Sequence, residues 1–349
     1  MNRPISRDSM YSIRWLTLCL CGVAALASAD TLYLRAGEQE EGRLKSMDAG
    51  AVVFEGRDGA KAVKTEDLTR IQLQRARAFD DVDTADKITD PDLRACIAQQ
   101  PSDKDYPADG DVTLLQRRTF DLTTPGLIKE TTRTITKILR QRGENAGSTN
   151  VWYFDDTDTP EIDFALTVTP DGRVLHLSDA ALKNESVHSR LPDYRRLSRD
   201  RFACKEPNPG SILDVQFTVL RKRDTPLEPF YAEEGFRYDS PVLRKEVVVV
   251  TAPGQSFCYG LNAACNGNVD YAEQKDGSLV RHVWTLKQPM PGIVQEPLMP
   301  PRNTYVPVLT LGAEASWDGV ARAYRKALDE LPALSDPLRA KALDLAKKG

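Results

Sequence analysis

The chain reads Phe164-Ala165-Leu166-Thr167-Val168-Thr169-Pro170-Asp171-Gly172-Arg173 near its middle, an apolar run followed by a Pro-Asp-Gly turn. A short apolar run that ends in such a turn is typical of a β-strand entering a hairpin. Comparable runs recur through residues 109–312 without helical periodicity between them, and this pattern predicts an antiparallel β-sandwich. The other predicted strands are Val112–Leu115, Thr132–Leu139, Val151–Phe154, Ile212–Val219, Lys245–Val250 and Leu279–Thr285.

Residues 30–74 form a separate block of short strand-like segments. Thr31–Arg35, Ala51–Glu55 and Leu68–Leu73 have strand character, and Arg57-Asp58-Gly59 is a hairpin turn signal. Four or five strands in so short a block predict a small SH3-like β-barrel.

The remaining segments are predicted to be helical or connecting. Residues 75–108 read as an acidic linker with one short helix that begins at Asp90-Pro91-Asp92. Residues 313–349 read as a C-terminal helical segment, in which Trp317, Val320, Tyr324 and Leu328 share one face behind Ser316 as N-cap.

The N-terminus predicts export. Residues 1–29 contain a basic region, an apolar run from Trp15 to Leu26 and the small-residue motif Ala27-Ser28-Ala29. This order is that of a cleavable signal peptide, with cleavage near Ala29-Asp30. The apolar run is too short to span a bilayer, so we expect a periplasmic or secreted protein with no membrane span in the mature chain.

Composition excludes several classes of function. The net charge of −4 provides no electrostatic basis for binding nucleic acid. The sequence contains neither a G-x-G-x-x-G nor a Walker pattern, and no C-x-x-C or H-E-x-x-H zinc motif. We therefore predict no cofactor and no metal.

Four cysteines remain after removal of the signal peptide, and an even number in an oxidising compartment favours disulfides. Cys258 and Cys265 flank a short loop and are the first predicted pair, which leaves Cys96 with Cys204. The alternative is a reactive thiol, for which Cys204 with His188 is the pair nearest in sequence.

Three other features could carry function. The histidines His176 and His282 lie in strand-like segments, where a structural role is more common than catalysis. The acidic loop Asp155–Asp163 has oxygen ligands for calcium but lacks the usual register of a calcium loop. A basic run is either a solvated loop or a docking surface for an anionic partner; its members are Arg190, Arg195, Arg196, Arg199 and Arg201.

Residues of about 106–330 resemble a bacterial domain of unknown function that precedes transglutaminase-like domains in exported proteins. The resemblance is carried by landmarks in a fixed order: Tyr106-Pro107-Ala108, the hairpin 165–174, Pro209–Asp214, Asp239–Val242, Glu296–Pro301 and Ser316–Ala321. It implies an immunoglobulin-like β-sandwich. The family usually continues into a papain-like core, whose catalytic cysteine has no counterpart here, so no catalytic residue is carried over.

These observations predict a non-catalytic exported accessory module. It would position a transglutaminase-like partner or bind a peptide or cell-wall ligand. The alternatives are a thiol-dependent acyl-transfer enzyme and a calcium-stabilised adhesion module.

Overall fold

The computed structural model describes residues 30–35, 38–48, 50–56, 59–72, 78–178, 181–187, 197–223, 230–294, 296–313, 316–329 and 335–348. The predicted signal peptide lies outside these residues. The chain divides into two compact units, residues 1–76 and 77–349. Among the described residues, no helix has the length and apolar character that a bilayer crossing requires.

The first unit is a five-stranded antiparallel sheet in the order β4-β3-β2-β1-β5. Leu32, Val52 and Phe54 form its buried core. The end strands β4 and β5 are not paired with each other in the described residues, so the strands expected here are present but no closed barrel is formed. The strands are β1 (Asp30–Leu34), β2 (Gln39–Met47), β3 (Ala51–Gly56), β4 (Gly59–Lys64) and β5 (Leu68–Gln72).

The second unit is built on an eight-stranded sheet in the order β10-β9-β13-β7-β6-β15-β18-β17. All neighbours are antiparallel except β6 and β15. The strands are β6 (Asp111–Asp121), β7 (Leu127–Ile138), β9 (Asp158–Val168), β10 (Val174–His176), β13 (Ile212–Lys222), β15 (Lys245–Thr251), β17 (Val269–Asp276) and β18 (Leu279–Leu286).

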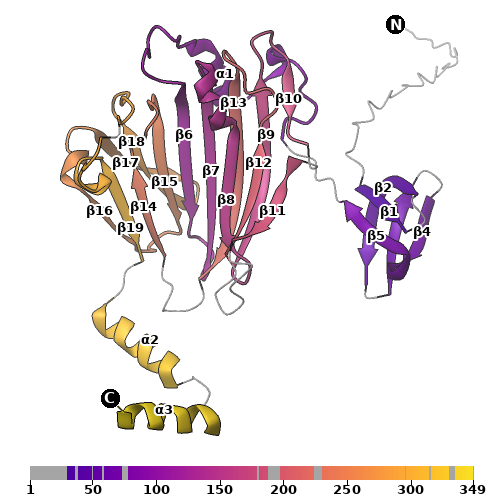
Figure 1. The fold of residues 1–349 in the computed structure, drawn as a ribbon. Coiled ribbons are helices and arrows are strands. Elements are labelled where there is room, and N and C mark those ends of the chain that lie inside the picture. Colours follow the sequence, from indigo (N-terminus) through magenta and orange to yellow (C-terminus); the bar gives the residue numbers. More distant parts are fainter. Residues whose placement is uncertain are drawn as a thin grey trace, which may run out of the picture. The chain divides into compact units, whose positions relative to one another are not determined.

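Two three-stranded sheets accompany the large one. The β8 sheet has the order β11-β12-β8, and the β14 sheet has the order β14-β19-β16. Figure 1 shows the β8 sheet on one side of β6 and β7 and the β14 sheet on the other. Their strands are β8 (Ser148–Phe154), β11 (Lys183–Ser186), β12 (Leu197–Ala203), β14 (Tyr231–Gly235), β16 (Cys258–Leu261) and β19 (Val308–Gly312).

Both small sheets cover the same face of the large sheet. Val219, Glu130 and Phe120 are directly opposite one another on β13, β7 and β6, so their side chains share a face. Val219 belongs to the apolar cluster under the β8 sheet, and Phe120 belongs to the cluster under the β14 sheet. We call this the front face.

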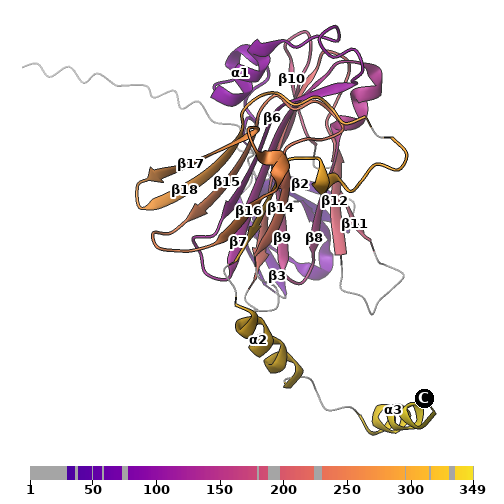
Figure 2. The same ribbon diagram turned by 90° about the vertical axis from the view of Figure 1, so that its left-hand side faces the viewer.

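Helix α1 (Pro91–Gln99) covers the opposite face, which we call the helix face. Leu93 and Cys96 of α1 are buried with Leu115 and Ile135 of the sheet. The expected start of this helix is confirmed, because the Asp90 side chain accepts a hydrogen bond from Leu93 N at 2.8 Å. The segment predicted as a linker thus contributes to the core, and Figures 1 and 2 both show α1 at one end of the sheet.

The C-terminal segment contains α2 (Trp317–Asp329) and α3 (Asp336–Lys348). Ser316 caps α2 by accepting a hydrogen bond from Gly319 N at 3.1 Å. The prediction of a mainly β protein with several antiparallel sheets and short C-terminal helices is confirmed. The strand order alone does not establish the finer immunoglobulin-like assignment.

Candidate functional site

A trough runs along the front face between the β8 sheet and the β14 sheet. It consists of three adjoining cavities of about 290, 310 and 210 Å³. The first two share Arg118, Glu130 and Arg221 in their linings, and the last two share Ile128, Arg223 and Phe230. The central strands of the large sheet form its floor.

The floor carries an unbroken series of ion pairs, which we call the ion-pair chain. In order, its members are Lys245, Glu234, Arg118, Glu130, Arg221, Asp158 and Arg223. Consecutive members alternate in charge, and they come from six strands or strand ends of both the large sheet and the β14 sheet.

Short contacts join the members of the ion-pair chain. Arg118 is 2.6 Å from Glu130 and also pairs with Glu234. Arg221 is 2.8 Å from Glu130 and 2.6 Å from Asp158. Each carboxylate therefore has two cationic partners, and this pairing compensates for the hydration that the buried charge has lost.

The outer members are held in the same way. Arg223 is 3.1 Å from Asp158, and Lys245 is 3.2 Å from Glu234. Lys245 also donates a hydrogen bond to the Tyr238 hydroxyl. Because Lys245 is fully buried, these two partners compensate for its lost hydration.

Acids and arginines differ in their exposure. The side chains of Asp158, Glu234 and Glu130 are 0, 2 and 7% exposed, whereas those of the three arginines are 17–31% exposed. The carboxylates thus lie beneath the guanidinium groups, and the floor that the trough offers to a ligand is cationic.

The pKa values of two buried acids, Glu130 and Asp158, agree with ionised carboxylates in the ion-pair chain. Burial opposes ionisation of Glu130, but Arg118 and Arg221 outweigh it and lower the pKa of this carboxyl. Burial also opposes ionisation of Asp158, and the Phe154 amide together with Arg221 and Arg223 lowers its pKa. Both groups are therefore ionised at neutral pH.

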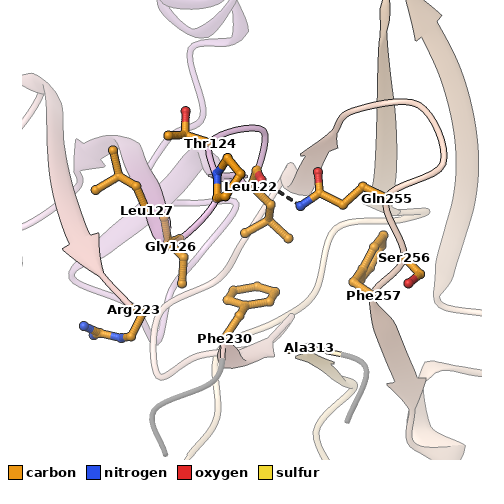
Figure 3. Close-up of a pocket in the computed structure, with 12 residues that line it drawn as sticks. Leu122, Thr124, Gly126, Leu127, Arg223, Phe230, Gln255, Ser256, Phe257 and Ala313 are labelled. Carbon is orange, nitrogen blue, oxygen red and sulfur yellow. Dashed lines mark hydrogen bonds between the residues drawn. The ribbon is translucent and has the colours of Figure 1, made fainter. Parts of the chain in front are cut away.

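One end of the trough is apolar (Figure 3). Leu122, Leu127, Ile128, Phe230 and Phe257 surround the cavity of about 210 Å³, and Arg223 lies at its border with the charged part. Gln255 closes one wall, with its Nε2 donating to Leu122 O at 2.7 Å.

The predicted disulfides are absent, because all four cysteines are free thiols. Cys96 belongs to the cluster on the helix face and Cys204 to a cluster on the front face, so the large sheet separates them. Cys265 is buried and donates to Val308 O at 3.3 Å, whereas Cys258 is exposed on β16.

The other sequence-predicted residues lie outside the trough or outside the described residues. Arg190, Arg195 and Arg196 fall in the part that is not described. Arg199 is on β12, where it pairs with Glu185 at 2.5 Å and lies over the Trp152 ring at 5.5 Å. Arg201 is exposed on the same strand.

The remaining candidates also have structural partners. Asp158 of the acidic loop is bound to arginines, and Asp163 accepts from Thr218 Oγ1 at 2.9 Å. His176 Nε2 is 2.6 Å from Val82 O, and His282 Nδ1 is 2.9 Å from the Tyr271 hydroxyl. His188 is not among the described residues.

Sequence reasoning missed the whole ion-pair chain. Glu130 lies in Lys129-Glu130-Thr131-Thr132-Arg133, whose polar side chains resemble those of a solvated strand face. Lys245 is the first residue of β15 and stands beside Glu246 ahead of the valine run, a place where many exposed lysines occur. The available signal was that Glu130, Thr132, Thr134 and Thr136 share one face of an otherwise buried central strand.

A model of a known protein family matches part of the second unit. Residues 124–292 match a family described as Domain of Unknown Function with solved-structure structure (DUF3857). A crystal structure of a protein from Parabacteroides distasonis, described as a putative protease, aligns with a TM-score of 0.57 at 17% identity. That alignment covers 63% of this chain and 44% of the other protein, and it shows a common fold.

A second solved structure aligns with a lower TM-score. An M1 zinc metallopeptidase from Deinococcus radiodurans aligns at 10% identity over 59% of this chain and 43% of its own, with a TM-score of 0.27. The chain thus spans less than half the length of both of these solved structures. No curated protein matches the sequence.

Proposed function

We propose that this chain is a non-catalytic, exported binding module, and that its trough binds a peptide or cell-wall ligand through the ligand's carboxylate groups. The observation that carries this proposal is the layered ion-pair chain, in which buried carboxylates hold partly exposed arginines in place. The resemblance to a domain that accompanies transglutaminase-like enzymes supports an accessory role. The signal-like residues 1–29 support a periplasmic or secreted location.

The arginines are suited to binding an anion. A guanidinium group has five N–H donors in a fixed plane and matches a carboxylate in bidentate geometry. Arg118 uses three of its donors on Glu130 and Glu234. Its position is set by these buried partners, so a ligand carboxylate would meet a group that has already lost its rotational freedom.

The cysteines support the non-catalytic part of the proposal. A cysteine nucleophile must be a thiolate. Burial raises the pKa of Cys204 to about 12 and that of Cys96 to about 11, so both thiols are protonated at neutral pH. This favours the binding module over the thiol-dependent acyl-transfer enzyme.

A direct binding measurement tests the proposal. We would titrate the mature chain from Asp30 into the fluorescein-labelled hexapeptide Val-Thr-Glu-Thr-Glu-Thr, in which the valine and both glutamates share one face of an extended strand, and follow fluorescence anisotropy. The matched probe has glutamine in place of glutamate. We expect the acidic peptide to bind about 10-fold more tightly, which corresponds to about 1.4 kcal/mol.

Two variants locate the site. Arg221→Gln leaves Glu130 with Arg118 and Asp158 with Arg223, so the fold keeps its compensation, and we expect the preference for the acidic peptide to disappear. Arg199→Gln, outside the trough, is the control and should bind as the unsubstituted chain does. Equal binding of the two peptides, no binding at millimolar concentration, or a loss confined to Arg199→Gln would each overturn the proposal.

A further inference from the structure

We infer that the ligand of the trough binds as an added β-strand, hydrogen-bonded to the free edge of β8. This inference rests on the proposed function and specifies its ligand as an extended peptide. Four observations carry it: two free strand edges at the trough, the direction of the peptide groups of β8, the residue types on that edge, and the charge of the floor.

The strands that border the trough are end strands of their sheets. β8 ends the order β11-β12-β8, and β14 ends the order β14-β19-β16. Asn150, Val151 and Trp152 of β8 line the cavity of about 290 Å³, while Tyr231 and Glu233 of β14 line that of about 310 Å³. A sheet edge offers a row of backbone donors and acceptors to an incoming strand.

The pairing of β8 with β12 fixes which peptide groups face the trough. Cys204 N donates to Gly147 O at 2.9 Å, and the register continues from this pair through Ala203 and Ser148. In an antiparallel ladder, alternate residues bond to the partner strand. Gly147 bonds to β12, and therefore Asn150 and Trp152 direct their N–H and C=O groups away from it.

The end of the strand agrees with this assignment. Phe154 has the same parity as Trp152, and its N–H bonds to Asp158 Oδ2 at 3.2 Å instead of to β12. Within the part of the chain that the structure describes, no hydrogen bond is formed on the trough side by the backbone of Asn150 or Trp152. These groups are available to a ligand.

The residue types leave this edge unprotected. Free edges are usually blocked by lysine, proline or a bulge that prevents pairing with another chain. β8 reads Ser-Thr-Asn-Val-Trp-Tyr-Phe and has neither charge nor proline. β14, in contrast, presents the exposed Glu233 at the trough, which would repel an acidic ligand. The two edges therefore differ, and β8 is the strand to which the peptide is added.

The side chains on the floor of the trough determine which residues the peptide should contain. Side chains of an added strand alternate between the floor and the solvent. Those directed at the floor would meet Arg118 and Arg221 in the middle and the apolar cavity at one end. The favoured ligand is an extended peptide with an acidic residue and an aliphatic or aromatic residue separated by an even number of positions.

Substitution of the edge amide provides a test. Trp152→Pro removes the outward N–H, and proline is tolerated at such a position of an edge strand. Trp152→Ala keeps the N–H and loses the same ring, so it is the matched control. With the valine–glutamate hexapeptide, we expect Trp152→Pro to bind at least 10-fold more weakly than Trp152→Ala, because the two variants lack the same ring and differ in the outward N–H. Equal affinities of the two variants would overturn the inference.

Backbone methylation of the ligand tests the same hydrogen bonds without altering the protein. We expect the hexapeptide with N-methyl groups at alternate residues, in each of the two registers, to bind at least 10-fold more weakly in one register. If both methylated peptides bind like the parent while Arg221→Gln still abolishes the acidic preference, the inference fails and the proposed function stands. If the parent peptide does not bind, the proposed function itself fails.

Amide hydrogen exchange identifies the edge. Bound peptide should protect the amides of Asn150 and Trp152. Protection of Tyr231 and Glu233 with no change at β8 would show that the peptide is added to β14 and would overturn the inference.

Discussion

Free thiols are the residue-scale feature in which the structure departs furthest from expectation. Composition and predicted export favoured two disulfides, yet the four cysteines of the described chain are free thiols, and the large sheet separates Cys96 from Cys204. Cys265 fills its site by bonding to the Val308 carbonyl, and Cys258 alone is exposed. The cysteines therefore serve mainly as small buried side chains.

A thiol titration of the mature chain checks this assignment. With a disulfide reagent such as dithionitrobenzoate at neutral pH, we expect one rapidly reacting thiol in the native protein, Cys258. The other three should react only after denaturation, because burial raises the pKa of Cys96, Cys204 and Cys265 and excludes the reagent.

Two controls make the titration decisive. Cys258→Ser should abolish the rapid phase, and denaturation without reductant should release four thiols from the unsubstituted chain. Two or no thiols after denaturation would restore the disulfide interpretation.

Helix α1 illustrates how an element of nine residues is fixed to a large sheet. Asp90 caps the helix and also binds Arg133, at 2.8 Å, while Asp92 pairs with Arg117 at 2.6 Å. Arg133 in turn binds the fully buried Asp214 at 2.7 Å. The helix thus contributes charges that the helix face requires, in addition to the apolar contacts of Leu93 and Cys96.

Two substitutions at Asp90 separate the cap from the ion pair. Asp90→Asn keeps a good N-cap but removes the charge beside Arg133, whereas Asp90→Ala removes both. We expect both variants to lower the free energy of unfolding, and Asp90→Ala to lower it by about 1 kcal/mol more than Asp90→Asn. Arg133 retains Asp214 in both cases, so the sheet should remain folded.

Urea denaturation followed by tryptophan fluorescence is the appropriate measurement. The tryptophans of the mature chain are Trp152, Trp284 and Trp317, which all lie in the second unit, so the signal excludes the first. Equal destabilisation by Asn and Ala would show that the cap contributes nothing.

At the scale of the whole molecule, the sequence predicted strands far better than their arrangement. Alternation in Ile212–Val219 or Lys245–Val250 reveals a strand and its two faces, but not which strand lies beside it. The parallel pairing of β6 and β15 brings Gln116 beside Lys245 across a long separation in sequence, and no local pattern encodes this. The trough depends on that arrangement and was therefore not predictable.

The same limit explains why the sequence did not predict the candidate site. The basic run with Arg199 was conspicuous because its charges are adjacent in sequence, yet Arg199 pairs on the outer side of the β8 sheet. Arg118, Arg221 and Arg223 come from different strands and converge only in the fold. The caps at Asp90 and Ser316 and the turn at Gly172, where φ is +85°, could be placed from local sequence.

The buried carboxylates make opposite predictions for the effect of pH on stability, according to whether folding lowers or raises their pKa. Glu130 and Asp158 on the front face, and Asp90 and Asp92 on the helix face, have lowered pKa values in the folded state, where their cationic partners outweigh burial. Their stabilisation is present above the unfolded pKa of about 4 and is lost as the pH falls below it. The free energy of unfolding should therefore decrease steeply below about pH 4.

Asp214 acts in the other direction. Burial raises its pKa to about 6 even though Arg133 binds it, so between about pH 4 and 6 the folded state holds a proton that the unfolded state releases. Stability should accordingly decline as the pH rises through this window, by at most about 3 kcal/mol. Urea denaturation at unit steps from pH 3 to pH 8 should show a maximum near pH 4–5. In Asp214→Asn, which cannot ionise, the decline from pH 4 to 6 should disappear while the loss below pH 4 remains; an unchanged profile in this variant would show that Asp214 is already ionised in that window.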